Sequence, residues 1–576
     1  MRRILQFILL GAVIAVPVLQ AQQSRAFTPV TTAMLVNPPA EDWLMYSRTY
    51  DAQRHSPLRQ ITRDNVSTLR EVFKKEFATG NQESIPLVHD GVMYVMLPGN
   101  TVQALDATTG AVLWEHKRTS GATRAKALAL YEDMVFYTAP DTPENMIVAL
   151  DARTGAVRWE TKTAGNTTSG AIVVEGKVLS GRTCRTQADC YISAHDAKTG
   201  KEAWRFYTAA GDDDPGGASW AGSPVAGRLA TTWGLAGGYD PARRLIFWGV
   251  ANPMPNTRMD RHGGNAEAIP AHSPADLYSN STVALNPDTG KLVWYYQHLP
   301  GDDWDEDYTN ERTLVRTAVN PDPKAVKWIN PDITRGEQRD VALMVGEGGG
   351  IWALDRDKGQ FLWANPFPFD APNFLISNID GKTGRVHLND AVRLKKPGDR
   401  KVVCYWNTRS YWPTAYHPGL NALYVPYVEN CLDMTAADPA NNVRERRVGI
   451  AREGSNLATW AGLMKVDVAT GVMKPIYTGQ APSQGAVLTT ASDLVFWGDL
   501  NQKFRAFDAG SGRILWETTL GGVIQNSTIT YAVNGKQYVA VLTGSGLTTS
   551  SPISQARIKP VRTYNALYVF ALPDVK

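Results

Sequence analysis

The residues of this chain best suited to chemistry lie in one short acidic run. Residues 301–307 read GDDWDED, so five carboxylates surround Trp304. An ionised carboxylate can take a proton from a substrate hydroxyl, and carboxylate oxygens also bind hard cations. A solvated acidic surface loop is the alternative. Because a tryptophan inside so acidic a run favours a structured loop, we expect this segment to carry a site.

The N-terminus predicts export. Arg2 and Arg3 precede an apolar run from Ile4 to Leu19, and small and polar residues follow around Ala21. This order is typical of a secretory signal peptide. The alternative is a membrane anchor, but the apolar run is shorter than the ~20 residues that span a bilayer. We expect a signal peptide over residues 1–22 and a periplasmic mature chain over 23–576 with no stable membrane insertion.

The four cysteines predict disulfides in that oxidising compartment. Cys184, Cys190, Cys404 and Cys431 allow three pairings, of which we favour the local ones, 184 with 190 and 404 with 431. Zinc binding is the competing interpretation, but neither pair has CxxC spacing. The sequence also contains no CxxCH, so we expect no covalently attached c-type haem and a separate electron carrier.

Composition favours many short strands over long helices. The chain has 49 glycines, 34 prolines and 17 tryptophans, and no linker that divides it, so we expect a single domain. The net charge of +3 among 115 charged residues suggests no nucleic-acid surface.

One motif repeats along the chain. Six copies end in a tryptophan, the first being ALDATTGAVLW, and a degenerate copy, KVDVATGVMK, starts at Lys465. The six end at Trp114, Trp159, Trp204, Trp294, Trp363 and Trp516. The first three lie 45 residues apart, whereas the next step is 90, so we expect a hidden copy near residues 238–248, GYDPARRLIFW.

Each copy reads as a strand, a tight turn and a second strand. The Asp or Asn can bond to backbone two residues on, and the Gly accepts a positive φ. The tryptophan supplies a flat surface for the neighbouring unit. Units of this length predict an all-β fold, an eight-bladed β-propeller; a solenoid is the alternative and would need capping repeats.

Two features complete this prediction. The C-terminal stretch ALYVFALP resembles the strand before each turn, so we expect it to complete a blade that the N-terminal segment begins. Longer insertions at about 210–225, 255–280, 300–340, 365–412 and 432–460 interrupt the period, and loops of this kind carry a propeller's chemistry.

Several segments in their order resemble one family. They are DWLMYSRTYDAQRHSPLRQIT from Asp42, TTWG from Thr231, YDPARRLIFWGVANP from Tyr239 and WYYQHLPGDDWDEDY from Trp294. Together with the repeat they resemble the pyrroloquinoline-quinone (PQQ) dependent methanol and ethanol dehydrogenases, in a divergent form, from Asp42 almost to the C-terminus. The resemblance implies an alcohol dehydrogenase with PQQ in its central channel, beside a Ca²⁺ or lanthanide ion.

The resemblance also implies roles for single residues. Asp305 matches the general base on the alcohol, while hydride moves to the quinone. Asn252 matches an amide ligand of the metal, its alternative being a turn asparagine before Pro253. Asp307 falls where lanthanide-using members carry an extra carboxylate, and the alternative for this residue is a surface charge. By this resemblance, Asp305, Asn252 and Asp307 would hold the ion together with PQQ oxygens.

Further residues match contacts to PQQ. Trp233 matches the floor under the ring, with core packing as the alternative, and Lys126, or else Arg124, falls where the family has an arginine for a carboxylate. The others are Glu83, Ser169, Thr231 and Arg356, the last beside the quinone oxygens.

The chain departs from the family pattern at four places. A metal-ligating glutamate falls on Arg185 or Thr186, so Arg185 is expected to turn to a PQQ carboxylate or away. No adjacent cysteine pair exists to cover PQQ. Tyr411 replaces an asparagine and could donate to PQQ or simply pack. Gln484 replaces a tryptophan, which would widen the pocket for an alcohol larger than methanol.

Two other function classes stay open. One is a non-catalytic propeller scaffold for assembly, favoured by the missing glutamate. The other is a quinoprotein that acts on sugars, aldehydes or polymers. For the alcohol dehydrogenase, the expected partners are a small alcohol and a soluble cytochrome c or similar periplasmic acceptor, and a homodimer is compatible with this sequence.

Overall fold

The fold is built almost wholly from strands. A computed structural model describes residues 27–118, 125–140, 144–482, 484–525, 527–561 and 565–574. The α-helices in these ranges are α1 (Thr32–Val36), α2 (Arg258–Arg261) and α3 (Ser550–Gln555). None of them has the length and apolar character that a membrane crossing requires. The predicted signal peptide lies outside the described residues.

The first three repeats supply the third and fourth strands of three antiparallel sheets. The first sheet contains β3 (Leu87–His89), β4 (Val92–Leu97), β5 (Thr101–Asp106) and β6 (Val112–Lys117). The second contains β7 (Ala129–Tyr131), β8 (Met134–Pro140), β9 (Asn145–Asp151) and β10 (Val157–Thr163). The third contains β11 (Ala171–Val174), β12 (Lys177–Ser180), β13 (Tyr191–Asp196) and β14 (Glu202–Tyr207).

Four further sheets carry the remaining copies. The fourth sheet contains β16 (Gly238–Asp240), β17 (Leu245–Gly249), β19 (Ser281–Leu285) and β20 (Leu292–Gln297). The fifth contains β21 (Thr313–Val319), β23 (Glu337–Val345), β24 (Ile351–Asp355) and β25 (Phe361–Asn365), with β22 (Trp328–Ile329) at its edge. The sixth contains β29 (Ala415–His417), β30 (Ala422–Val428), β33 (Ala461–Asp467) and β34 (Met473–Gly479), and the seventh contains β35 (Leu488–Thr490), β36 (Leu494–Gly498), β37 (Lys503–Asp508) and β38 (Ile514–Thr519) with β1 (His55–Ser56).

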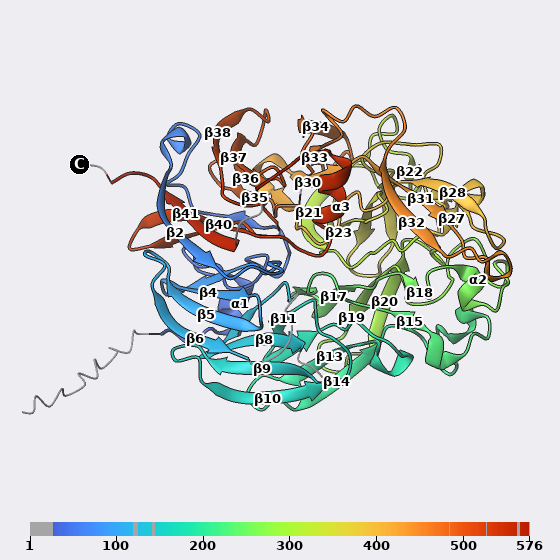
Figure 1. Ribbon diagram of the computed structural model, residues 1–576, viewed down its shortest axis with the longest axis horizontal. Coiled ribbons are helices and arrows are strands. Elements are labelled where there is room, and N and C mark those ends of the chain that lie inside the picture. The colour runs from blue at the N-terminus through green and yellow to red at the C-terminus, as the bar shows by residue number, and fades with distance from the viewer. Residues whose placement is uncertain are drawn as a thin grey trace, which may run out of the picture.

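The two ends of the chain share one sheet. It contains β39 (Ile529–Val533), β40 (Lys536–Thr543), β41 (Asn565–Ala571) and the N-terminal β2 (Arg70–Phe77). β2 and β41 run antiparallel, from the pair Arg70 and Ala571 to the pair Phe77 and Asn565. Figure 1 shows the C-terminal strands beside β2, with the other sheets following one another around the molecule. The predicted completion of an N-terminal blade by ALYVFALP is therefore confirmed.

The hidden repeat predicted at residues 238–248 is wrong. This segment forms β16 and β17, the first two strands of the sheet whose repeat ends at Trp294. A Cβ on Gly290 of that repeat would lie 2.3 Å from Trp204, so the units of Trp204 and Trp294 are direct neighbours. The 90-residue step reflects long insertions and not a missing unit. The remaining unit is the one that the two chain ends share.

The tryptophans join consecutive units. Trp114 Nε1 donates to the Ala152 carbonyl of the next unit at 3.0 Å, and Trp159 Nε1 donates to Ala197 at 2.9 Å. Gly155, with φ +72°, lies so close under Trp114 that a Cβ would be 2.5 Å from the ring. Gly155 is therefore required both by its φ and by the indole above it.

The insertions form small sheets of their own. These are β15 (Leu229–Ala230) with β18 (Pro253–Met254), β26 (Ile376–Ile379) with β27 (Val386–Leu388), and β28 (Arg400–Cys404) with β31 (Asn430–Thr435) and β32 (Arg446–Ala451). The insertion predicted at 300–340 is partly wrong, because β21 and the start of β23 belong to a repeat sheet. Both predicted disulfides, Cys184–Cys190 and Cys404–Cys431, are confirmed, the second joining β28 to β31.

Candidate functional site

The acidic run forms a structured loop. Trp304 is fully buried, and the carboxylates of Asp302, Asp303 and Glu306 are buried with it. Asp302 organises the turn, because its oxygens accept the backbone N–H groups of Trp304 at 2.5 Å and Glu306 at 2.7 Å. A solvated surface loop is therefore excluded for this segment.

Asp305 is the accessible carboxylate of this loop. Its side chain is 33% exposed, while the other four carboxylates of the run are buried. Its backbone has φ +66°, a left-handed conformation that a non-glycine residue adopts at a cost. Such strain persists where the surroundings fix it, and it is concentrated at functional sites.

Asn252 and Asp307 lie next to Asp305. Asn252 Nδ2 donates to Asp305 Oδ1 at 2.9 Å, and the Asn252 backbone N–H donates to Asp307 Oδ1 at 3.3 Å. Trp233 Nε1 donates to the second oxygen of Asp307 at 2.7 Å. Four residues that the sequence singled out, from the acidic loop, the GVANP segment and the TTWG segment, thus meet at one place.

Buried carboxylates crowd this place. Burial, and next the neighbouring Asp305, raise the pKa of Asp307 to about 8. Burial raises the pKa of Asp302 to about 7. Burial and then Asp307 raise the pKa of Glu347 well above its usual value, and Glu347 Oε2 accepts the Asp307 backbone N–H at 3.0 Å. Because like charges repel in a buried site, a cation here would stabilise the ionised forms.

Glu306 adds an acid without a partner. Both of its carboxylate oxygens are buried and make no hydrogen bond within the described residues. Burial, and then the charge of Asp302, raise its pKa well above the usual value. Within those residues no three His, Cys, Asp or Glu side chains are grouped as ligands of one ion. The donor chemistry thus suits a hard cation, although the carboxylates do not converge on one point.

Arg447 on β32 was missed by sequence reasoning. Its guanidinium pairs with Asp305 Oδ2, and its Nε lies 3.2 Å from Glu445 Oε1. Asn256 Nδ2 donates to the same Glu445 oxygen at 3.2 Å. Arg447 lies in the 432–460 insertion, and no pattern in the sequence linked it to Asp305, 142 residues away.

A second cluster surrounds the ring of Trp233. Lys126 Nζ lies 4.9 Å from the Trp233 ring centre and 4.5 Å from that of Tyr411, and the two rings meet edge to face at 5.4 Å. Lys126 also pairs with Glu83 at 3.3 Å, and Tyr411 donates to Glu83 Oε1 at 3.0 Å. The half-buried Trp233 thus combines a flat aromatic face with a cation and hydroxyl groups.

Three residues with hydroxyl groups, Thr168, Ser169 and Thr231, lie on segments next to Trp233. Thr168 Oγ1 donates to the Trp233 carbonyl at 3.1 Å. The buried Ser169 hydroxyl instead donates to the Gly170 carbonyl and accepts the Gly181 N–H, each at 3.2 Å. Thr231 is buried, and its carbonyl accepts the Ala251 N–H at 2.8 Å, beside Asn252. Of these, Thr168 was not predicted.

The family comparison agrees with this geometry. The family model described as "PQQ: Glucose/ethanol/alcohol dehydrogenase, beta-propeller domain" matches residues 43–133, 161–365 and 456–539. The chain belongs to this family. The predicted resemblance to PQQ-dependent alcohol dehydrogenases is therefore confirmed, as is a β-propeller domain.

Relatives and solved structures of this quinoprotein family support the assignment. The chain is 30% identical to the quinohemoprotein alcohol dehydrogenase ADH-IIG of Pseudomonas putida, over 88% of this chain and 72% of that one. It is 29% identical to the quinoprotein alcohol dehydrogenase PedH of the same species, over 90% and 89%. Among solved structures, a europium-containing methanol dehydrogenase is 26% identical with a TM-score of 0.78, over 94% of this chain and 100% of that one.

One residue assigned to PQQ, Arg356, lies elsewhere in this family member. Arg356 pairs with Asp240 and Asp340, each at 2.9 Å, and its carbonyl accepts Trp294 Nε1 at 3.2 Å. It occupies the outer turn where a neighbouring tryptophan docks, so its assignment beside the quinone is wrong. Arg185 is exposed in the Cys184–Cys190 loop, and its expected contact with a PQQ carboxylate stays a prediction.

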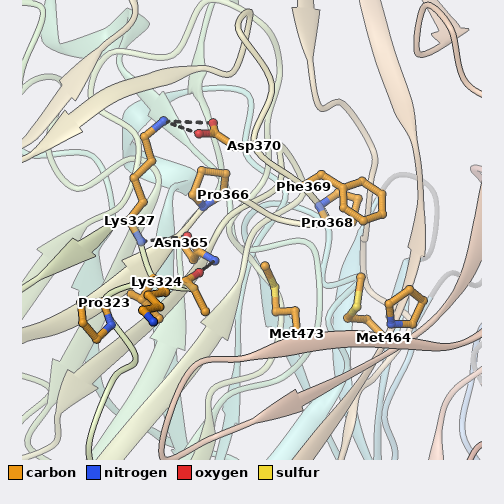
Figure 2. Close-up of a pocket in the computed structure, with 13 residues that line it drawn as sticks. Pro323, Lys324, Lys327, Asn365, Pro366, Pro368, Phe369, Asp370, Met464 and Met473 are labelled. Carbon is orange, nitrogen blue, oxygen red and sulfur yellow. Dashed lines mark hydrogen bonds and ion pairs between the residues drawn. The ribbon is translucent and has the colours of Figure 1, made fainter.

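Two cavities differ in their relation to this site. Figure 2 shows one of about 410 Å³ lined by Pro323, Lys327, Phe369, Met464 and Met473, with Lys327 paired to Asp370; it contains no predicted site residue. The other, of about 260 Å³, is lined by Trp406, Trp412 and Gln484 among others. Gln484 thus lines a cavity, as expected of the residue that replaces the family tryptophan.

Proposed function

We propose that this chain is a quinoprotein alcohol dehydrogenase that oxidises an alcohol to an aldehyde or ketone. The observation that carries the proposal is the placement of Asp305. It is the partly exposed carboxylate of a buried acidic loop, in contact with Asn252. Asn252 in turn forms a hydrogen bond to Asp307, which accepts a hydrogen bond from Trp233. Asp305 acts as the general base that takes the hydroxyl proton of the alcohol.

The residues around Trp233 fit PQQ, a flat molecule with three carboxylates. Trp233 offers a half-buried aromatic face, and Lys126 offers a buried cation 4.9 Å from it. Glu83, Tyr411 and the neighbouring Thr168 supply polar groups at the edge. PQQ, when bound, accepts the hydride of the alcohol. Lys126 would neutralise a cofactor carboxylate, and Tyr411 would donate a hydrogen bond at the ring edge; Ser169 and Thr231 would complete the wall.

The residues around Asp305 fit a hard cation. Asn252, Asp305 and Asp307 would hold Ca²⁺ or a lanthanide ion through oxygen atoms. The raised pKa values of Asp307 and Glu347, caused by burial and mutual repulsion, support a cation at this place. The ion would act as a Lewis acid toward the reacting oxygen atoms. Asp307 adds the negative oxygen that favours a trivalent ion.

The setting follows from the fold and the N-terminus. We assign eight blades, the last shared by the two chain ends, to one domain over residues 23–576, exported to the periplasm by residues 1–22. Without a CxxCH motif, the electrons leave to a separate cytochrome c or similar acceptor. The cavity lined by Gln484 supports an alcohol larger than methanol. A homodimer remains compatible with this assignment.

The test is reconstitution of the purified protein without oxygen. PQQ is added with Ca²⁺ or with La³⁺, and the absorbance of bound quinone and alcohol-dependent dye reduction are measured. We expect quinone binding and metal-dependent turnover. Asp305→Asn should retain PQQ but lower kcat at least about a hundredfold, whereas Asp64→Asn, an exposed aspartate, should leave it unchanged. Absence of quinone binding with either metal would contradict the proposal and favour a scaffold propeller.

A further inference from the structure

Two histidines lie opposite each other on neighbouring segments of two insertions. His272, in the 255–280 insertion, pairs with His387 of β27 in an antiparallel bridge. The Ser273 N–H donates to the Val386 carbonyl at 2.9 Å, and an equivalent backbone bond at 2.9 Å flanks the pair on its other side. His272 and His387 therefore occupy a non-hydrogen-bonded position, the kind that brings two side chains closest together on one face.

The separation of the two imidazoles fits a shared metal ion. Their ring centres are 5.4 Å apart. Two imidazoles on one zinc ion, with Zn–N bonds of about 2.0–2.1 Å in a tetrahedral arrangement, have ring centres about 5.2 Å apart. Both side chains are partly exposed, so an ion can reach them from solvent. The backbone thus already places the two rings at nearly the distance that a common ion requires.

The hydrogen bond of His272 selects the ring nitrogen that a metal ion needs. Its Nδ1 lies 3.0 Å from the Ser273 carbonyl oxygen. Because a carbonyl only accepts, Nδ1 carries the proton, and the lone pair for a metal ion lies on Nε2. Histidines that bind metals typically donate their other ring N–H in this way, and a backbone carbonyl is a common acceptor.

The next strand adds an oxygen donor to the same face. Asn378 of β26 lies opposite His387, so Asn378, His387 and His272 form one row across three neighbouring segments. The Asn378 side chain is exposed, and its amide oxygen is available to complete the ligand set together with water. Arg385 and Asp380 act on His387 with opposite charges, and both are exposed, so water screens them.

A second pair of histidines lacks this arrangement. The rings of His55 and His417 are 5.1 Å apart, but His417 is buried. Its Nδ1 accepts the Leu420 N–H at 3.3 Å, so its proton is on Nε2, which faces Asp493 Oδ1 at 3.3 Å. Neither ring nitrogen of His417 thus offers a lone pair to an ion. Exposure and tautomer both favour the pair of His272 and His387.

We propose that His272 and His387 bind a transition-metal ion such as Zn²⁺, Ni²⁺ or Cu²⁺, with Asn378 and water as further ligands. Imidazole nitrogen suits these ions, whereas Ca²⁺ takes oxygen ligands. The site is distinct from the carboxylates around Asp305. The inference therefore does not rest on the proposed function.

A bound ion would join the insertion that contains His272 to the hairpin of β26 and β27. The same insertion contains Arg258, whose Nη1 donates to the Pro270 carbonyl at 3.0 Å. The Arg258 backbone N–H donates to Asp303 Oδ1, in the acidic loop, at 2.6 Å. The ion would thus hold a segment that contacts the acidic loop. Because it would bind the folded chain, it should raise the melting temperature.

The test is calorimetry of Zn²⁺ binding to the purified protein in an excess of Ca²⁺, which occupies sites built from oxygen ligands. We expect one Zn²⁺ to bind per chain. His272→Gln and His387→Gln each remove a nitrogen ligand and should weaken Zn²⁺ binding at least about tenfold. His116→Gln is the matched control, because this partly exposed histidine packs against the ring of Tyr137.

A spectroscopic measurement on the parent protein keeps the test decisive if a variant fails to fold. The electron paramagnetic resonance spectrum of bound Cu²⁺ should show coupling to two imidazole nitrogens, and coupling to fewer would overturn the proposal. Unchanged Zn²⁺ binding in His272→Gln would overturn it as well. Loss of binding in His417→Gln but not in His387→Gln would place the ion at the other pair, and displacement of Zn²⁺ by Ca²⁺ would place it at the carboxylates; either result contradicts the proposal.

Discussion

The guanidinium of Arg447 pairs with the carboxylate of Asp305 across 142 residues of sequence. Asn252 binds one oxygen of this carboxylate and Arg447 binds the other. Arg447 therefore competes with a bound metal ion for one oxygen of Asp305. β32 therefore brings a competing cation to the place where the family resemblance puts a metal.

Arg447→Gln should raise the affinity for Ca²⁺, because it removes this competitor. Both side chains are about a third exposed, at 30% and 33%, so water screens the pair and its contribution is small. We expect Ca²⁺ to bind about two- to fivefold more tightly, as measured by calorimetry. Arg444→Gln, an exposed neighbour, is the control. Weaker Ca²⁺ binding in Arg447→Gln would show that Arg447 supports the metal site.

Sequence patterns predicted the repeat and its turns because those contacts are local. In the first copy Asp106 Oδ1 accepts the Thr108 N–H two residues on at 2.9 Å, and Gly110 has φ +73°. The family resemblance misassigned Arg356, because its carbonyl accepts Trp294 Nε1 in the docking turn and its guanidinium pairs with Asp240 and Asp340. The place of a residue in the repeat therefore predicts its contact with the neighbouring sheet better than it predicts a contact with a cofactor.

Contacts between residues far apart in the sequence could not be predicted in the same way. Glu347 and Arg447 reach the site only because the fold brings them there from 40 and 142 residues away. Asp305, Asn252 and Trp233 were predicted together because each lies in a family motif. Asn378 and His387 lie between the matched family ranges, and no motif identified them.

The metal-free protein should lose stability as the pH rises. The pKa values of Asp302 and Asp307, about 7 and 8, exceed those of an unfolded chain, so the folded state binds more protons. The resulting loss of folding stability is absent below about pH 4, where the carboxyl groups are protonated in both states. The loss grows with pH until the pH exceeds the pKa values of the folded state. The melting temperature in a chelator should therefore fall between pH 5 and 8.

Glu306→Gln tests the source of this pH dependence. Among the residues that the structure describes, neither oxygen of Glu306 has a hydrogen-bond partner, so a neutral amide of the same shape costs little and cannot ionise. The variant should melt higher than the parent at pH 8 and show a flatter pH profile. Glu71→Gln, at an exposed position, should leave the profile unchanged. A profile in Glu306→Gln as steep as the parent's would place the titrating charge elsewhere.

Terbium luminescence should report the metal site directly. Trp233 Nε1 bonds to Asp307 Oδ2 at 2.7 Å, so a lanthanide on Asp307 lies near an indole that can sensitise it. Asp307→Ala removes one negatively charged ligand of the ion. The loss of this single contact should weaken Tb³⁺ binding about tenfold or more. Asp332→Ala is the exposed control. Unchanged luminescence titrations in Asp307→Ala would exclude this carboxylate as a ligand.

Gly155 and Gly535 allow the docking of a tryptophan to be separated from backbone strain. Their φ angles are nearly equal, +72° and +77°, but a Cβ on Gly155 would lie 2.5 Å from Trp114 whereas one on Gly535 meets nothing within 4 Å. Gly535→Ala should cost about 1–2 kcal/mol, the penalty of a left-handed alanine. Gly155→Ala should cost about 1–3 kcal/mol more, because the added methyl pushes against the indole. Denaturant unfolding of both variants measures the difference. Equal losses of unfolding free energy in the two variants would mean that Trp114 moves freely and that its stacking does not join the first two units. A larger loss in Gly155→Ala would mean that the contact between Gly155 and Trp114 contributes to the stability of the packing between neighbouring sheets.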